Sequence, residues 1–212
     1  MQKTSVKGAI TNTGNKIVRD PHRLIYSSSY DRGCVYLLTN WSLIKREVPD
    51  CSLHIFYGWD LFNVIHANNP ARLRWKQQVL EMMEQDGIFE HGRIGHIQLA
   101  QEFAKSGIWA YPSNFSGEIS TISAMKAQAY GAVPVTVNRY SLAETVKNGI
   151  RVDCEIETKE GQEEYIKSLI ALLKDHKKQE SIRDSMMTWA KSQFTWDEVA
   201  KKWDGLFGYL KN

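Results

Sequence analysis

Cysteine is scarce in this chain and follows no pattern. Three cysteines, Cys34, Cys51 and Cys154, occur among 212 residues, and no two of them have CxxC spacing. A structural metal held by cysteines and a disulfide framework are therefore not expected. A reducing compartment fits this cysteine usage best, which predicts a cytoplasmic protein.

Long apolar runs and a strong charge of one sign are also missing. Residues 1–20 lack the apolar core of a signal peptide, and no window approaches the roughly 18 apolar residues that span a bilayer. The net charge is +3 and the basic residues are scattered, which argues against nucleic acid as a partner. With 42% hydrophobic residues, the chain has the composition of a globular protein that can bury one sizeable core.

From Arg23 onward, short runs of β-branched and aromatic residues alternate with longer helical patterns. The expected strands are 23–29, 52–59, 88–95 with its exit turn, 107–113 and 132–138. The expected helices are 34–48, 71–85 opened by Pro70, 96–106, and one that ends at Gly131. Strands separated by helices predict βαβ units, a parallel sheet, and ligand binding beyond the carboxyl ends of the strands.

After Asp153 the pattern changes to three successive helices, 163–176, 179–194 and 195–210. Trp196, Trp203 and Phe207 in the last helix form either local core or an interface, and local core is favoured. The expected organisation is a linker or lead-in segment (1–20), a Rossmann-like domain (21–153) and C-terminal helices of the same domain (154–212).

The first polar strand exit is SSSYDRG, Ser27 to Gly33. Hydroxyl groups, a glycine and free backbone N–H groups before a helix suit an anion. Arg32 favours this interpretation, because a cation beside the positive end of a helix is unfavourable unless an anion offsets it. The equal alternative is a surface arginine neutralised by Asp31, with Asp31 as the helix N-cap.

The second exit is EHGRIGHIQL, Glu90 to Leu99. Its two glycines flank Arg93 and Ile94 and allow the backbone to approach a flat ligand such as a base. On spacing alone a plain glycine turn is favoured. His91 and His96 are candidate ligands or acid–base groups, although a histidine near a turn is more often a surface residue.

The third exit, YPSNFSGEISTIS, contains Glu118. In the first turn of a helix, a glutamate is stabilised by the helix dipole by about 0.3–1 kcal/mol. Alternatively, Glu118 accepts hydrogen bonds from sugar hydroxyls while the N–H groups of Ile119, Ser120 and Thr121 face a phosphate.

Together, these loops resemble a known family. YPSNFSGEISTISAMKAQAYGAVPVTVNRYSLAETVKNG is similar to the donor-binding signature of retaining GT-B glycosyltransferases of family 4: P-S, a glutamate, seven residues, a second glutamate within E-A-x-A-x-G, and a nearby P-V. Glu144 to Gly149 match a later E-x-V-x-x-G. The resemblance extends in order from about Gly14 to Phe207, and its motifs are specific only in combination.

The resemblance implies one half of a GT-B fold and the transfer of a sugar from a nucleotide sugar to an acceptor with retention. It assigns the diphosphate to Ser28, Arg32 and Gly33, and the base to the backbone of Arg93 and Ile94. Glu118, the catalytic candidate, would bind donor-sugar hydroxyls, and Ile119, Ser120 and Thr121 would bind phosphate. The family acts without a metal, and no other cofactor is implied.

The chain departs from the family pattern in two ways. Lys126 replaces the second glutamate, which in the family accepts hydrogen bonds from ribose hydroxyls. An ammonium group only donates, which indicates weakened or altered ribose recognition. A phosphate contact and a solvated surface lysine are the alternatives.

The second departure is that only the donor-binding half is matched, so an acceptor-binding domain, separate or fused N-terminally, would be needed for transfer. A non-catalytic or truncated nucleotide-binding or interaction module is the rival interpretation. An epimerase or phosphorylase of the same architecture fits less well.

Overall fold

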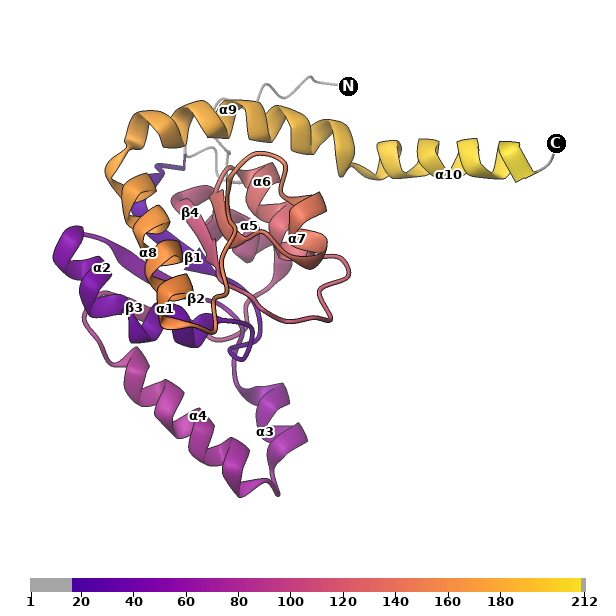
Figure 1. Ribbon diagram of the computed structural model, residues 1–212. Helices are drawn as coiled ribbons and strands as arrows, with labels where there is room; N and C mark the ends of the chain where they lie inside the picture. The colour runs from indigo at the N-terminus through magenta and orange to yellow at the C-terminus, as the bar shows by residue number, and fades with distance from the viewer. Residues whose placement is uncertain (1–16, 211–212) are drawn as a thin grey trace.

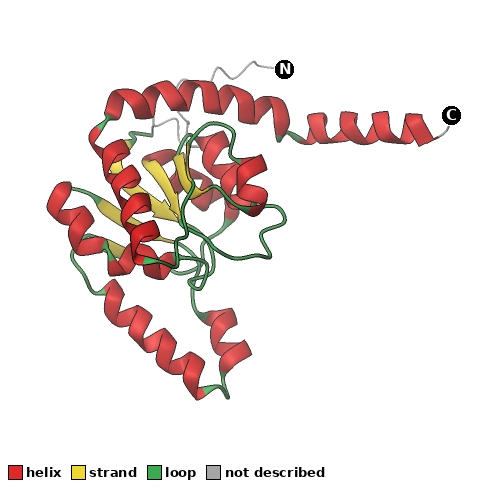
Figure 2. Ribbon diagram, viewed as in Figure 1, coloured by secondary structure: helices red, strands yellow, loops and turns green. Residues whose placement is uncertain are grey.

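The computed structural model describes residues 17–210, which fold around one parallel sheet (Figures 1 and 2). The strands are β1 (Asp20–Tyr26), β2 (Ser52–Ile55), β3 (Ile88–Glu90), β4 (Ser106–Tyr111), β5 (Val133–Val137) and β6 (Ile150–Val152). Their order is β3-β2-β1-β4-β5-β6, and all neighbouring pairs are parallel. This is the order of a doubly wound sheet, so the expected Rossmann-like fold is confirmed.

Helices cover the sheet on both faces. They are α1 (Cys34–Thr39), α2 (Trp41–Glu47), α3 (Asp60–His66), α4 (Pro70–Met83), α5 (His96–Lys105), α6 (Ile122–Tyr130), α7 (Tyr140–Thr145), α8 (Lys159–Lys174), α9 (His176–Gln193) and α10 (Trp196–Leu210). Right-handed crossovers place the helices that follow β1 and those that follow β4 on opposite faces. Accordingly α8 packs on α2 and on β5 and β6, while α9 packs on α6.

The centre of the sheet is buried on both faces. All six residues of β4 are buried, and its register brings Ile108 beside Leu24 of β1 and Val133 of β5. A continuous apolar run such as that of β4 is typical of a parallel strand covered by helices on both sides. This rigid centre fixes the positions of the loops that leave β1 and β4.

Two arginines hold the edge at which the strands begin. Arg19 precedes β1 and donates to the carbonyl oxygens of Tyr130, Gly131 and Ser106 at 2.9, 2.8 and 2.7 Å. Arg183 of α9 donates to the same Gly131 carbonyl at 2.8 Å. Carbonyl groups at a helix C-terminus lack donors within the helix. At the end of α6, these two arginines donate to such carbonyl groups. Burial, and then the nearby Arg183, lower the pKa of Arg19 to about 10.

The structure differs from the sequence expectations at several elements. The helix expected over 34–48 is two helices that meet at Asn40, whose side chain donates to the carbonyl of Tyr36 at 2.9 Å. Such side-chain bonds to the backbone compete with helix continuation. The strand expected over 52–59 ends at Ile55, and α3, α7 and β6 were not expected. The lead-in segment lies outside the described residues up to position 16, and β1 starts at Asp20.

The last helix extends away from the body of the protein (Figure 1). Trp196, Trp203 and Phe207 of α10 are 85%, 53% and 52% exposed, so the favoured expectation of local core is wrong. Among the elements of residues 17–210, α10 makes its main packing contact with α9. It is too far from the sheet to bury its aromatic side chains there.

Candidate functional site

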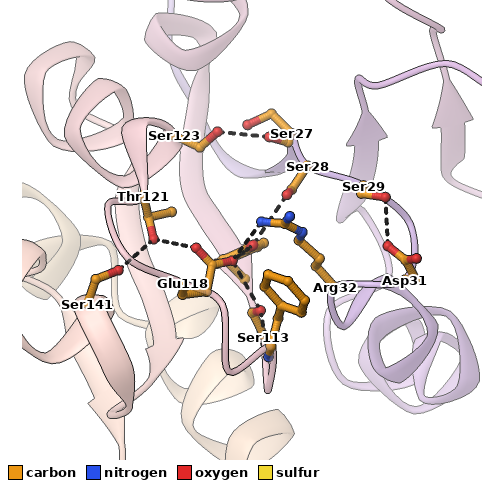
Figure 3. Close-up of polar contacts among 12 residues, drawn as sticks. Ser27, Ser28, Ser29, Asp31, Arg32, Ser113, Glu118, Thr121, Ser123 and Ser141 are labelled. Atoms are coloured by element: carbon orange, nitrogen blue, oxygen red, sulfur yellow. Dashed lines mark hydrogen bonds and ion pairs between the residues drawn. The ribbon is translucent and has the colours of Figure 1, made fainter. Parts of the chain in front are cut away.

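The loops after β1 and β4 meet at the carboxyl edge of the sheet, where the strand order reverses (Figure 3). A doubly wound sheet binds its ligands at this point. The Ser123 hydroxyl of α6 donates to the Ser27 carbonyl at 2.9 Å, which ties the first loop to the helix that follows the second.

A glycine allows the two loops to approach closely. Gly33, the N-cap of α1, has φ 91°, and a Cβ added there would lie 2.1 Å from the Pro112 carbonyl oxygen. Only glycine fits both this left-handed conformation and this contact between backbones. Gly33 therefore acts on the site through backbone packing.

Glu118 is the centre of a network of hydroxyl groups. Its side chain is 4% exposed, and its Oε1 accepts hydrogen bonds from the Tyr111 hydroxyl and, at 3.4 Å, from Ser113. Its Oε2 accepts from the Thr121 hydroxyl at 2.7 Å, and Thr121 contacts Ser141 of α7 at 3.1 Å. A carboxylate has about four acceptor positions, so one position on Oε2 is not used by the described residues.

Tyr111 connects this network to the first loop. Its hydroxyl lies 3.2 Å from the Ser28 hydroxyl. Burial, and then the hydrogen bond to Glu118, raise the pKa of Tyr111 to about 12, so the phenol stays protonated and donates. Sequence reasoning missed Tyr111, although its place at the end of a buried strand, directly before Pro112, marked it as a residue at the sheet edge.

Arg32 lies over the same carboxylate. One of its guanidinium nitrogens is 3.5 Å from Glu118 Oε1, and the group is 4.1 Å from the centre of the Phe115 ring. Its side chain is 35% exposed. A partly exposed guanidinium beside one buried carboxylate keeps donors available for a further anion.

The alternative interpretation of Arg32 is wrong. Asp31 pairs with Arg72 of α4 at 2.8 Å and accepts from Ser29 at 2.6 Å, and Gly33 rather than Asp31 is the N-cap. The charge of Arg32 is therefore balanced by Glu118.

The sequence predicts Glu118 in the first turn of a helix, and the structure contradicts this prediction. The helix α6 begins at Ile122 with Thr121 as N-cap, so Glu118 belongs to the preceding loop. Within residues 17–210, no protein acceptor takes the backbone N–H groups of Ile119, Ser120 or Thr121. Ile119 and Ser120 are exposed, so a ligand can approach this part of the loop, whereas Thr121 is buried.

The second loop borders a separate cavity of about 380 Å³. It is lined by Phe56, His91, Ile94, Gln98, Gln101 and Glu102. The ring of His91 lies against Phe56 and contacts His54 at 2.9 Å. Burial lowers the pKa of both histidines, that of His54 to about 3, and nearby Arg23 adds to the effect. Arg93 is exposed beside this cavity.

Lys126 connects the second loop to α6. Its ammonium nitrogen lies 3.0 Å from Nδ1 of His96, the first residue of α5. In the described part of the chain, no carboxylate lies within 4.0 Å of this nitrogen. His96 lies at the N-terminus of α5, which is itself positive. Lys126 and this helix end together attract acceptors and anions rather than hydroxyl donors.

Two absences hold for residues 17–210. No group of three or more His, Cys, Asp or Glu side chains is placed to bind a metal ion. No helix in that range is long and apolar enough to cross a membrane.

The fold is shared with solved glycosyltransferase structures. The chain matches the pneumococcal O-GlcNAc transferase GtfA in complex with UDP and GlcNAc with a TM-score of 0.70 at 16% identity, covering 92% of this chain and 37% of that one. It matches Anabaena Alr3699/HepE in complex with UDP and glucose with a TM-score of 0.68 at 14% identity, covering 89% and 48%. For sucrose-phosphate synthase from Thermosynechococcus elongatus the TM-score is 0.66 at 17% identity, covering 89% and 45%.

This chain spans less than half the length of those proteins. These likenesses establish the fold, that of one half of a GT-B protein. No curated protein matches the sequence. The family model of the glycosyl transferases group 1 matches residues 13–187, more than half of the sequence. With the sheet and its carboxyl edge as described, the chain belongs to the glycosyl transferases group 1 family.

Proposed function

We propose that this chain is the donor-binding part of a retaining, metal-independent glycosyltransferase that uses a nucleotide sugar. The observation that carries the proposal is the Arg32–Glu118 pair at the β1/β4 edge, beside N–H groups before α6 that have no acceptor among the described residues. A nucleotide sugar needs cationic and N–H donors for its diphosphate and acceptors for its sugar hydroxyls. This edge offers both within one hydrogen-bonded network.

In this proposal Arg32 and the N–H groups of Ile119, Ser120 and Thr121 bind the diphosphate. As the bond from sugar to phosphate breaks, negative charge grows on the leaving diphosphate. Fixed donors stabilise that charge without reorganising, which is the main source of electrostatic catalysis. Ser28 and Gly33 support the arrangement, the first through Tyr111 and the second through its contact with Pro112.

Glu118 holds the donor sugar through its remaining acceptor position. Tyr111, Ser113 and Thr121 keep the carboxylate oriented. A carboxylate held in this way accepts a sugar hydroxyl in one defined direction. Glu118 is therefore the candidate catalytic residue of this half.

The base would lie by the backbone of Arg93 and Ile94, next to the cavity that Ile94 lines. Lys126, paired with His96, occupies the position from which a carboxylate would accept ribose hydroxyls. We infer that ribose recognition is altered in this chain. The same residue is the observation that favours the rival function, a non-catalytic nucleotide-binding or interaction module.

Transfer requires an acceptor-binding domain, fused or separate. The exposed aromatic side chains of α10 are a surface that such a domain would cover. All three cysteines are free and buried, which is consistent with a reducing, cytoplasmic environment.

Calorimetric titration with UDP, GDP, ADP and their sugar conjugates tests the donor site. We expect one base to bind, and Arg32→Ala to weaken that binding about 30-fold, equivalent to about 2 kcal/mol for a charge-assisted contact. Arg46→Ala, an exposed arginine in the last turn of α2, is the matched control and leaves binding unchanged.

Lys126→Glu separates the two functions. Binding by wild type supports a working donor site, and binding only by Lys126→Glu supports a pocket that has lost its ribose contact. If neither protein binds any of these nucleotides, the donor-site proposal is wrong and the non-catalytic module is favoured.

A further inference from the structure

A second cavity opens at the carboxyl edge of the sheet, beyond the Glu118 network. Its volume is about 310 Å³, and it is lined by Asn138, Arg139, Asp153, Cys154 and Glu155. Asn138 directly follows β5 and Asp153 directly follows β6. The cavity therefore lies on the same edge as Arg32 and Glu118, and none of its lining residues has a role in the donor site.

Asn138, one of the lining residues, carries a buried polar atom without a partner among the described residues. Asn138 donates from Nδ2 to Asp153 Oδ1 at 2.6 Å, which fixes the amide. Its Oδ1 is buried and has no hydrogen-bond donor among the described residues. A buried acceptor of this kind calls for a donor from water or from a ligand.

The charges around the cavity exclude one class of ligand. Arg139 forms an ion pair with Glu155, and Asp153 adds a second carboxylate. The lining therefore carries one positive and two negative charges. A phosphate or a nucleotide would be repelled, whereas an uncharged molecule rich in hydroxyl groups would find both donors and acceptors.

An exposed aromatic residue in a strained conformation lies next to the cavity. Among the described non-glycine residues, Tyr140 alone has a positive φ, 49°, and it is 45% exposed. Strain in an exposed aromatic residue is not offset by burial, and such strain often marks a functional position. Tyr140 directly follows Arg139, which lines the cavity.

The residue after Tyr140 is attached to the donor site. The Ser141 backbone N–H donates to the Glu118 carbonyl at 3.2 Å. The Ser141 hydroxyl contacts Thr121 at 3.1 Å, as Figure 3 shows. These bonds fix the start of α7 relative to Glu118. A molecule in the cavity would thus be held at a constant position with respect to a sugar on Glu118.

We propose that this cavity is a saccharide subsite for the acceptor, in which Asn138, Arg139, Asp153 and Glu155 bind hydroxyl groups. The planar amide, guanidinium and carboxylate groups can each bridge two neighbouring hydroxyls. The Tyr140 ring covers the less polar face of the sugar, whose C–H hydrogens are attracted to the negative face of an aromatic ring. The assignment to the acceptor rests on the proposed function, whereas the binding of a neutral saccharide does not.

Saturation-transfer NMR with neutral sugars tests the subsite, because it detects weak binding. The probes are the methyl glycosides of glucose, galactose, mannose and N-acetylglucosamine, together with maltose and cellobiose. We expect a signal from at least one probe with the wild-type chain. Tyr140→Gly removes the ring and relieves the positive φ, and Asp153→Ala removes the carboxylate that orients Asn138. Each variant should reduce the signal at least about 10-fold, the loss of one good polar or aromatic contact.

Two controls keep this test separate from the donor site. Glu163→Gln, on the exposed surface of α8, should keep the saccharide signal. Nucleotide titration on the same variants should show unchanged binding by Tyr140→Gly. Absence of any saccharide signal from the wild type, or a signal that survives both Tyr140→Gly and Asp153→Ala, overturns the proposal. A failure of nucleotide binding alone contradicts the donor site and leaves the saccharide result standing.

Discussion

Arg32 and Arg183 lie at opposite edges of the same sheet, near opposite ends of the same helix, α6. Arg183 is 4% exposed and donates to the Gly131 carbonyl just after the helix ends. Arg32 has a side chain that is 35% exposed, next to Glu118 in the loop before the helix begins. Arg183 also pairs with Glu180 of its own helix, so the two arginines differ in the Gly131 carbonyl, a kind of acceptor that only a helix C-terminus offers.

A helix C-terminus presents carbonyl acceptors, to which a guanidinium group can donate within the protein. A helix N-terminus presents N–H donors, which cannot accept from it. At the carboxyl edge, a single carboxylate therefore balances Arg32, and the remaining donors are available to an anion. The direction of the helices decides which arginine stabilises the fold and which one can bind a ligand.

Gly33→Ala should give the largest effect and tests how the carboxyl edge is packed. The added Cβ would lie 2.1 Å from the Pro112 carbonyl oxygen, at a position with φ 91°. We expect the free energy of unfolding to fall by about 3–4 kcal/mol, from left-handed strain plus overpacking. Urea denaturation measures it.

Gly92→Ala is the control for Gly33→Ala. Gly92 also has a positive φ, 69°, but no atom lies within 4 Å of its added Cβ. It should cost only about 1 kcal/mol, the backbone effect alone. Equal losses in the two variants would show that the contact between the two loops does not matter.

The comparison of the two arginines is tested directly by Arg183→Met and Arg32→Met. We expect Arg183→Met to lower the free energy of unfolding by about 2–3 kcal/mol, because buried carbonyl groups lose a charged donor. Arg32→Met should lower it by less than Arg183→Met does, because the Arg32 guanidinium is partly exposed and lies 3.5 Å from its single carboxylate partner. Nucleotide binding should be weakened more by Arg32→Met than by Arg183→Met. A variant that loses both stability and binding to the same degree would contradict the division between the edges.

The contact between His54 and His91 predicts that the stability of the fold depends on pH. Burial lowers the folded pKa of His54 to about 3, while the unfolded side chain titrates near 6.5. Below 6.5 the unfolded chain binds the proton and the folded chain does not. The stabilisation is therefore complete above pH 6.5 and is lost as the pH falls towards 3.

Between pH 6.5 and 5 we expect the free energy of unfolding to fall by about 1 kcal/mol because of His54. This value already includes a reduction by half for solvent screening. Denaturation of wild type and His54→Gln across this range measures the contribution. The facing groups, Arg23, His91, Glu102 and Lys105, remain in both proteins. An identical pH profile for the two proteins would contradict the assignment to His54.

Trp203→Ala should have the smallest effect, because α10 lies outside both edges. Trp203 is 53% exposed, whereas Trp109 in β4 is fully buried. We expect less than about 0.5 kcal/mol for Trp203→Ala and about 3–5 kcal/mol for Trp109→Ala. A large loss from Trp203→Ala would show that α10 packs on the rest of the chain in solution.

The sequence predicted the parallel sheet, because strand and helix patterns depend on residues that are close together in the chain. It did not predict α3, α7 or β6, which have only seven, six and three residues. Segments of that length carry too little periodicity and depend on tertiary packing. The break at Asn40 was missed for a related reason, since the apolar spacing continues across it on both sides.

For the candidate site, the sequence determined which residues lie at the ends of strands, and hence that Arg32 and Glu118 share one edge of the sheet. Only the tertiary structure decided their partners. Arg32 pairs with Glu118 rather than with the adjacent Asp31, since Asp31 is bound to Arg72, 41 residues away. The Glu118 carboxylate accepts from Tyr111 of a strand and from Thr121 of a loop. Ser141 of the helix α7 joins this network through Thr121. Periodicity along a chain fixes which edge a residue reaches, but side-chain partners depend on distances between segments that only the packed fold brings together.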